Sequence, residues 1–262
     1  MLIWQAFALF LGGIFAGFVN TLAGGGSIVS LSLMLLFGLD ANVANGTNRL
    51  AIIFQSLTSS ETFRVNKILD LKRGKAAVWS ALIGSLAGAW VAVDLNKEII
   101  EKIITIVMML MLVFIFYNPS RWLKGDPERN SKPANLFEIF LFLVIGFYGG
   151  FVQVGIGYLL LAGLVLQAGY DLVKANALKV FITFVYSPFA FAIFVWHHQV
   201  SWIHGIPLAI GASLGAFIAS KLAVRKGAGF IRWAIVVMII ITALQTFNVI
   251  DLATMFSFLK SK

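Results

Sequence analysis

GFVNTLAGGGS at residues 17–27 recurs in altered form as GFVQVGIGY at residues 150–158. In both copies an amide side chain, Asn20 or Gln153, is followed within a few residues by a glycine cluster. Glycine frees the backbone from the helical conformation, so each cluster predicts a break between two helices. Each cluster also precedes an unusually short apolar segment, 27–38 in the first copy and 158–168 in the second. The sequence therefore predicts two broken helices at corresponding places.

The composition around these breaks is typical of a membrane protein. Hydrophobic residues make up 60% and charged residues 12% of the 262 residues, and the mean hydropathy is +0.93. A soluble domain has about 45–50% apolar and about 25% charged residues. Ten apolar segments follow one another: 2–20, 27–38, 43–63, 75–93, 99–117, 136–153, 158–168, 173–196, 200–222 and 230–250. Because a helix crosses a bilayer with about 20 residues, we expect an all-α polytopic membrane protein with about ten membrane segments, two of them short.

The two halves of the chain correspond beyond the glycines. Asp40 matches Asp171, the pair 44–45 matches 175–176 (both Ala-Asn), and the glycines at 84 and 88 match those at 211 and 215. We divide the chain into a first repeat (1–117), a polar cytoplasmic linker (118–135) and a second repeat with a C-terminal tail (136–262). Each repeat holds five segments, an odd number, so the second enters the membrane from the opposite side. Inverted repeats of this kind are a common plan of secondary transporters.

Basic residues predict the orientation of the chain. Lysine and arginine gather in three stretches, 64–75, 121–132 and 221–232, and cytoplasmic loops carry an excess of these residues. The three stretches fall on one side if all ten segments cross, whereas the third falls on the opposite side if the two short segments do not. We therefore expect ten crossings in the cell (inner or plasma) membrane, with both termini outside. The net charge of +9 then reflects orientation, and no nucleic acid partner is expected.

Several kinds of chemistry are not expected from this chain. It has no cysteine and three histidines, too few for most metal centres, and we expect no catalytic residue, no metal and no cofactor. GASLG at 211–215 matches the G-x-S-x-G motif of esterases, but that motif needs a strand–turn–helix context. Its counterpart at 84–88 keeps only the glycines, a spacing that favours helix packing. No Walker A sequence is present, so ATP-driven transport by this chain alone is not expected.

The glycine breaks are the first part of a candidate anion site. The start of a half-helix presents unpaired backbone N–H groups and the positive end of the helix dipole, and a hydroxyl follows each break. The candidate substrate-binding residues here are Gly24, Gly25, Gly26, Ser27, Gly155, Gly157 and Tyr158. The alternative is that the glycines only allow close helix packing; their duplication before two short segments favours the site.

Cations and amides inside apolar segments extend the candidate site. Arg49 and Lys179 lie where an unpaired charge is costly, and they either bind the anion or extend to the membrane interface. Guanidinium and amide N–H groups suit an oxyanion, so the remaining candidates are Asn45, Asn48 and Asn176. Asn20 and Gln153 either bind the substrate or satisfy backbone groups at the breaks.

The arrangement of glycines resembles that of a known family. Gly13 and Gly17 precede the cluster at 24–26, Gly146 and Gly150 precede the cluster at 155–157, and Ala-Asn follows each cluster about twenty residues later. In these motifs the chain resembles, over essentially its whole length, the sulfite-exporter (TauE/SafE) family of membrane permeases. It departs from the family where Ile156 interrupts the second glycine run and where the prolines typical after the glycines are missing. The resemblance implies transport of small sulfur-containing anions, such as sulfite, sulfonates or sulfoacetate, without ATP hydrolysis.

We therefore expect a secondary transporter that moves a small sulfur-containing anion, such as sulfite or an organosulfonate, by alternating access around a central site. Its expected partners are the small anionic substrate and the lipid bilayer; the oligomeric state stays open, with a homodimer as one option. The alternatives are an anion channel, and a membrane-embedded enzyme or assembly factor without transport activity. A channel gives flux that needs no coupling ion, and an enzyme converts its substrate chemically.

Overall fold

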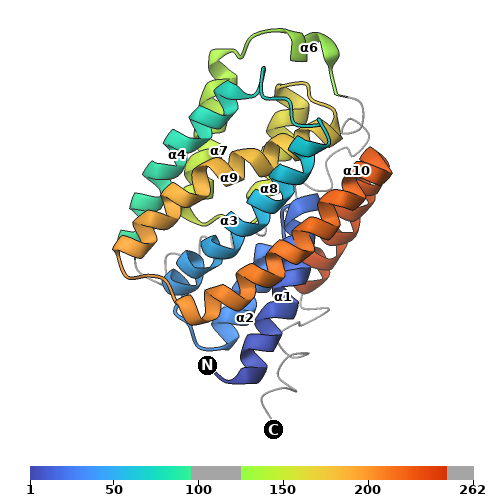
Figure 1. Cartoon of the computed structure of the whole chain (residues 1–262). Helices are drawn as coiled ribbons and strands as arrows, with labels where there is room; N and C mark the ends of the chain where they lie inside the picture. The colour runs from blue at the N-terminus through green and yellow to red at the C-terminus, as the bar shows by residue number, and fades with distance from the viewer. Residues whose placement is uncertain (96–124, 247–262) are drawn as a thin grey trace.

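The computed structural model describes residues 1–95 and 125–246, and every regular element in these ranges is a helix (Figure 1). The first half contains α1 (Ile3–Leu22), α2 (Ser27–Leu36), α3 (Ala41–Val65) and α4 (Lys75–Asp94). The linker contains the short helix α6 (Pro127–Ser131), and the second half contains α7 (Leu136–Phe151), α8 (Ile156–Ala162), the π-helix η2 (Gly163–Gln167), α9 (Leu172–Trp196) and α10 (Trp202–Thr246). The predicted segment 99–117 lies outside the described residues.

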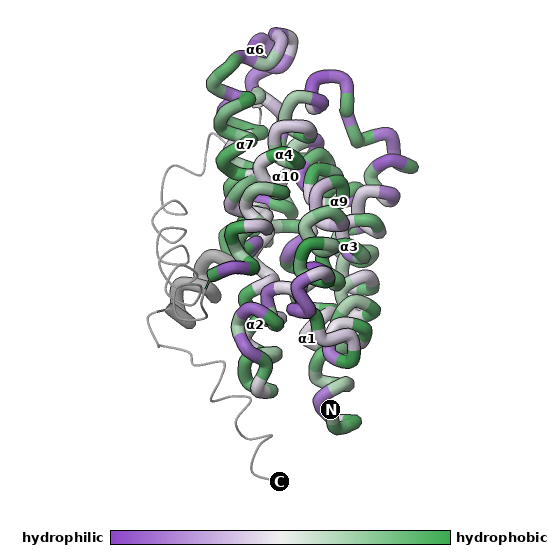
Figure 2. The backbone as a smooth tube through the Cα atoms, turned by 90° about the vertical axis from the view of Figure 1, so that its left-hand side faces the viewer, coloured by the Kyte–Doolittle hydropathy of each residue, from purple (hydrophilic) through white to green (hydrophobic). Residues whose placement is uncertain are grey.

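The lengths and hydropathies of these helices agree with a multi-pass membrane protein. Four helices in the described ranges are long and apolar enough to cross a bilayer: α1, α4, α9 and the stretch Trp202–Val237 of α10. The apolar helices α2, α7 and α8 with η2 are shorter. Figure 2 shows hydrophobic residues along the helices and hydrophilic residues gathered near α6, at one end of the molecule. The expectation of an all-α membrane protein is met.

Both predicted helix breaks are present. α1 ends at Leu22 and α2 begins at Ser27, while α7 ends at Phe151 and α8 begins at Ile156. The backbone between them takes left-handed conformations, with φ of +106° at Gly24 and +71° at Gly155. Glycine adopts these conformations without the steric cost that a Cβ atom brings. The glycines therefore end one helix and start the next, as the sequence predicts.

Each broken helix forms a hairpin that returns to the end of the molecule where it began. The ring of Trp4, at the start of α1, lies 5.4 Å from the ring of Phe37, just after α2. In the second half, the backbone N–H of Asp126, before α7, donates to the carbonyl of Gly169, just after η2, at 2.9 Å. Ten residues of helix span about 15 Å, half the bilayer core, so α2 returns from the interior. The expected ten full crossings are therefore not confirmed, because the two short segments return instead of crossing. A hairpin leaves the chain on the same side as two full crossings do, so the predicted orientation is unchanged.

The last two predicted segments, 200–222 and 230–250, belong to α10, which has a non-helical residue at Gly227 (φ 70°, ψ −161°). Residues 247–250 of the last segment lie outside the described ranges. In Figure 1 the loop after α3, helix α6 and the bend of α10 lie at the upper end of the molecule, opposite the N-terminus. The described residues of all three basic stretches therefore lie at one end.

The first helix of each half packs against the fourth helix of the other half. On α1, a Cβ atom at Gly17 would overlap the backbone of Ala212 on α10; on α7, one at Gly150 would overlap the backbone of Ser85 on α4. The GASLG motif lies within helix α10, where Gly211 packs against the backbone of α1. This is the packing role that the glycine spacing predicts. The two halves are thus interlocked, and each completes the packing of the other.

Which side of the membrane this basic end faces can be measured. The chain has no natural cysteine, so single cysteines can replace the exposed residues Lys72 and Glu128 at the basic end and His198 near the opposite end. With the basic end cytoplasmic, an impermeant maleimide labels Lys72→Cys and Glu128→Cys only after the membrane is permeabilised. His198→Cys is labelled in intact cells. Labelling of Lys72→Cys in intact cells would contradict the orientation.

An ion pair connects the two halves at this end. Both guanidinium nitrogens Nη1 and Nη2 of Arg73 donate to the carboxylate of Glu138, at 2.7 and 2.6 Å, and the two side chains are 11% and 4% exposed. The Glu138 carboxylate raises the pKa of Arg73, mainly through these hydrogen bonds. Because the pair joins the loop before α4 to the first turn of α7, it reinforces the packing of these two helices.

Loss of this ion pair has an expected cost in stability. Charged hydrogen bonds contribute about 1.5–3 kcal/mol, so Glu138→Gln should lower the free energy of unfolding by about this amount and lower the Tm in detergent. The matched control is Glu61→Gln, which removes an exposed pair with Arg64 and should leave the Tm unchanged. Equal Tm values for Glu138→Gln and wild type would contradict the stabilising role.

Candidate functional site

The two helix breaks meet in the interior of the protein. Gly24 of the first break and Gly157, at the start of α8, touch so closely that a Cβ atom on either would overlap the Cα atom of the other. Next to this contact, the hydroxyl of Tyr158 lies against Gly25, where a Cβ atom would be 2.8 Å from the phenolic oxygen. The breaks of the two halves therefore form one junction, with backbone against backbone.

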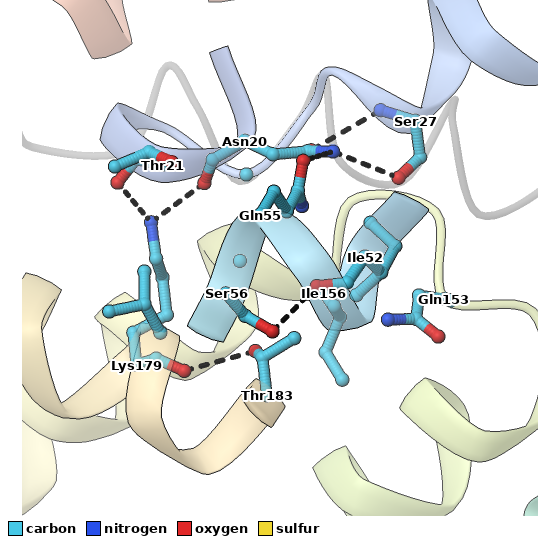
Figure 3. A pocket seen from close by; sticks show the side chains of 13 residues that line it. Asn20, Thr21, Ser27, Ile52, Gln55, Ser56, Gln153, Ile156, Lys179 and Thr183 are labelled. Carbon is cyan, nitrogen blue, oxygen red and sulfur yellow. Dashed lines mark hydrogen bonds between the residues drawn. The ribbon is translucent and has the colours of Figure 1, made fainter. Parts of the chain in front are cut away.

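A small cavity lies at this junction (Figure 3). The space that it leaves for the centre of a water molecule is about 20 Å³, which is enough for about one or two waters. Both breaks and four helices, α1, α2, α3 and α9, contribute to its wall together with the start of α8. The lining residues are Asn20, Thr21, Gly24, Ser27, Ile52, Gln55, Ser56, Gln153, Ile156, Gly157, Lys179, Val180 and Thr183.

Lys179 brings a positive charge to the cavity wall. Its side chain, on α9, is 2% exposed, and its Nζ donates to the backbone carbonyls of Asn20 at 3.0 Å and Thr21 at 2.9 Å (Figure 3). These carbonyls belong to the last turn of α1, where helix carbonyls lack partners within the helix. An ammonium has three N–H donors, so one donor remains beyond these two hydrogen bonds.

Arg49 binds the carbonyls at the end of α7, as Lys179 binds those at the end of α1. Its guanidinium, on α3, donates through Nη2 to the carbonyls of Gly150 and Phe151 and through Nη1 to the carbonyl of Gly149, all at the end of α7. It also donates to Oε1 of Gln153 at 2.9 Å, and it is fully buried. Arg49 does not line the cavity. Both cations point into the protein, so neither extends to the membrane interface.

The predicted amides Asn20 and Gln153 line the cavity and also hold the breaks in place. Oδ1 of Asn20 accepts from the backbone N–H of Ser27 at 3.2 Å, and its Nδ2 donates to the Ser27 hydroxyl at 3.3 Å. Asn20 thus satisfies the first backbone N–H of α2. This is the structural role that the sequence leaves open as the alternative to substrate binding. Nε2 of Gln153 donates to the hydroxyl of Ser187 at 3.4 Å. Both amides are thus fixed at the cavity wall.

Other predicted residues lie outside the cavity wall. Asn45 donates to the carbonyl of Phe151 at 2.9 Å, and Asn48 accepts from the hydroxyl of Ser30 at 2.6 Å. Asn176 is fully buried, and neither of its amide atoms has a hydrogen-bond partner among the described residues. The cavity wall includes Asn20, Gly24, Ser27, Gln153, Gly157 and Lys179; it does not include Gly25, Gly26, Asn45, Asn48, Arg49, Gly155, Tyr158 or Asn176.

Several cavity residues were not predicted from the sequence. Gln55 follows Asn48 by seven residues on α3, and Thr183 follows Lys179 by four on α9. Residues three, four or seven apart share a helix face. A stripe of polar residues along α3 and another along α9 are therefore the sequence signals that point to Gln55 and Thr183. The other lining residues that the prediction missed are Thr21, Ile52, Ser56, Ile156 and Val180.

Within the described ranges, the positive charges of Lys179 and Arg49 are not balanced by ion pairs. The ion pairs of residues 1–95 and 125–246 involve neither Lys179 nor Arg49. The other cavity side chains are amides, hydroxyls and aliphatic groups. A cavity with one cation and neutral polar groups offers a favourable environment to an anion and an unfavourable one to a second cation.

A comparison with known protein families identifies the family of the chain. The family model "Sulfite exporter TauE/SafE" matches residues 9–246. The chain belongs to the TauE/SafE family. The resemblance seen in the glycine motifs is therefore confirmed.

Relatives of this TauE/SafE member cover nearly its whole length. It is 28% identical over 238 residues to a Sinorhizobium protein named "Probable membrane transporter protein ORF9", covering 90% of each chain. It is 28% identical over 235 residues to a "Probable membrane transporter protein" of Haemophilus influenzae, covering 88% of this chain and 89% of the relative. Escherichia coli has a "Probable membrane transporter protein YfcA" that is 25% identical over 231 residues, covering 88% and 85%. No solved structure matches the chain.

Proposed function

We propose that this TauE/SafE member is a secondary transporter that moves a small sulfur-containing anion, such as sulfite or an organosulfonate, across the membrane by alternating access. Family membership and the names of the relatives support a membrane transporter. The observation that carries the proposal is the cavity where the two broken helices meet, whose wall has Lys179 as its one ionisable side chain.

The polar groups of the cavity suit an oxyanion. An anion that leaves water loses its hydration and must regain that free energy from donors in the protein. Lys179 has one ammonium N–H beyond those bound to α1, and amide and hydroxyl groups of Gln55, Gln153 and Ser27 line the same wall. Charge-assisted hydrogen bonds to sulfonate or sulfite oxygens are stronger than neutral ones. One cation in a wall of neutral donors matches a monoanion.

The packing of the helices suggests which parts move during transport. The glycine contacts hold α1 to α10 and α4 to α7 at backbone distance, so each pair moves as a unit. The cavity lies where the hairpins of these two units meet, and it is small in this conformation. Rocking of one unit against the other would separate Gly24 from Gly157 and open the cavity first to one side and then to the other.

Uptake into proteoliposomes tests the proposal. Purified protein is reconstituted, and uptake of labelled sulfite, sulfate, methanesulfonate and taurine is measured with and without a proton gradient, with protein-free liposomes as the control. We expect saturable uptake of sulfite or a sulfonate. Non-saturable flux with high turnover would instead identify a channel, and chemical conversion of the substrate would identify an enzyme.

A further inference from the structure

The carboxyl end of α1 is a place where a membrane protein needs a cation. α1 ends at Leu22 inside the protein, and the last carbonyls of a helix carry the negative end of its dipole. Water does not satisfy such groups within the hydrocarbon region of a bilayer. In transporters with discontinuous helices, carbonyls at these ends coordinate the coupling Na⁺ or H⁺.

In this chain, the carbonyls at the end of α1 bind a side-chain ammonium. Nζ of Lys179 lies 3.0 Å from the carbonyl oxygen of Asn20 and 2.9 Å from that of Thr21. The lysine is far away in sequence, 159 and 158 residues from these partners, and it reaches them from α9 in the other half. None of the described ion pairs involves Lys179. The dipoles of these two carbonyls therefore stabilise its positive charge.

The second broken helix ends in the same way. Arg49, on α3 of the first half, donates to the carbonyls of Gly149, Gly150 and Phe151 at the end of α7. The two ends thus have a common arrangement, in which a cation from one half neutralises the broken helix of the other. They differ in one respect, because Lys179 lines the cavity and Arg49 does not.

We propose that Lys179 is a tethered cation that occupies the position of a coupling Na⁺ at the end of α1. Transport by this chain then needs no Na⁺. Removal of the side chain leaves a site for a monovalent cation, Na⁺ or a small alkylammonium, between the carbonyls of Asn20 and Thr21. The transport consequence rests on the proposed function, whereas the binding consequence does not.

The binding consequence is tested on purified wild type and Lys179→Ala. The Tm is measured in NaCl, ethylammonium chloride and choline chloride at equal ionic strength, where choline is too large to replace an ammonium group. A ligand at about ten times its Kd raises the Tm of a chain of this size by about 4 °C. We expect this rise for Lys179→Ala in NaCl or ethylammonium chloride relative to choline chloride, and no rise for wild type. A folded Lys179→Ala with the same Tm in all three salts would overturn the proposal.

The transport consequence is tested on wild type, which needs no variant to fold. Uptake of sulfite or a sulfonate should proceed at the same rate in NaCl and in choline chloride, and dependence on Na⁺ would overturn the proposal. Lys179→Ala should regain part of its lost uptake in NaCl or ethylammonium chloride. If the liposomes take up none of the anions offered, the proposed function fails, and the Tm measurements still decide whether Lys179 stands in a cation site.

Discussion

Gly157→Leu should abolish transport while the protein still inserts and folds. Any Cβ atom at this position overlaps the Cα atom of Gly24 in the facing break, and a leucine also favours continuous helix through the break. Backbone atoms cannot turn away as the end of a side chain can, so the two breaks must separate and the cavity between them must change shape. Uptake into proteoliposomes is the measurement, and gel filtration and circular dichroism establish that the variant is folded.

Two further glycine variants make this prediction sharper. Gly229→Leu is the control, because nothing lies within 4 Å of a Cβ atom there, and it should transport like wild type. Gly25→Ala should lose less activity than Gly157→Ala, because the neighbour of Gly25 is the hydroxyl end of the Tyr158 side chain. Wild-type flux in Gly157→Leu would show that the site lies elsewhere.

Lys179→Gln should weaken substrate binding at least about tenfold. Hydrogen bonds to charged groups contribute roughly 1.5–3 kcal/mol, and about 1.4 kcal/mol corresponds to a factor of ten in Kd. The glutamine keeps most of the side-chain volume and an amide NH2 group with two N–H donors, so the change removes mainly the charge. Isothermal titration of the purified protein with sulfite or a sulfonate measures the apparent Kd.

Lys174→Gln provides a matched control on the same helix. Lys174 is 53% exposed and lies 3.9 Å from Asp171, so its loss should leave the Kd unchanged. If Lys179→Gln binds and transports like wild type, Lys179 does not belong to the substrate site.

Arg49→Gln should lower the Tm, because carbonyls at the end of α7 lose their donor.

The sequence predicted the breaks well because glycine clusters have a direct physical meaning. Residues without a Cβ atom, placed before two short apolar segments, leave few alternatives to an interrupted helix. Three of the predicted residues line the cavity: the duplicated amides Asn20 and Gln153, and Lys179, which the sequence marks as a cation inside an apolar segment. The hairpins were harder to predict, since a short segment alone does not tell whether the chain crosses or returns. That is decided by contacts between distant residues, such as Trp4 with Phe37.

The positions of the other polar residues could not be read from the sequence because it does not give the rotation of each helix about its axis. Asn48 and Arg49 are neighbours in sequence but point about 100° apart on a helix, and Arg49 faces the end of α7. Its partners there are backbone carbonyls, which are the same in every residue and give no signal in a sequence. In a sequence, a buried lysine or arginine with no acidic residue nearby is therefore interpreted as part of a ligand site, even when its partners are the carbonyls at a helix end.

The interlocked glycine contacts also determine when this protein can complete its fold during synthesis. Gly13 and Gly17 on α1 pack against Leu208 and Ala212 on α10, about 200 residues later in the chain. At a ribosomal rate of roughly 5–20 residues per second, α1 waits about 10–40 s for its partner. During this interval its glycine face lacks the helix that covers it in the folded protein. A ribosome that stalls before α10 is made would therefore leave the glycine face of α1 without its partner.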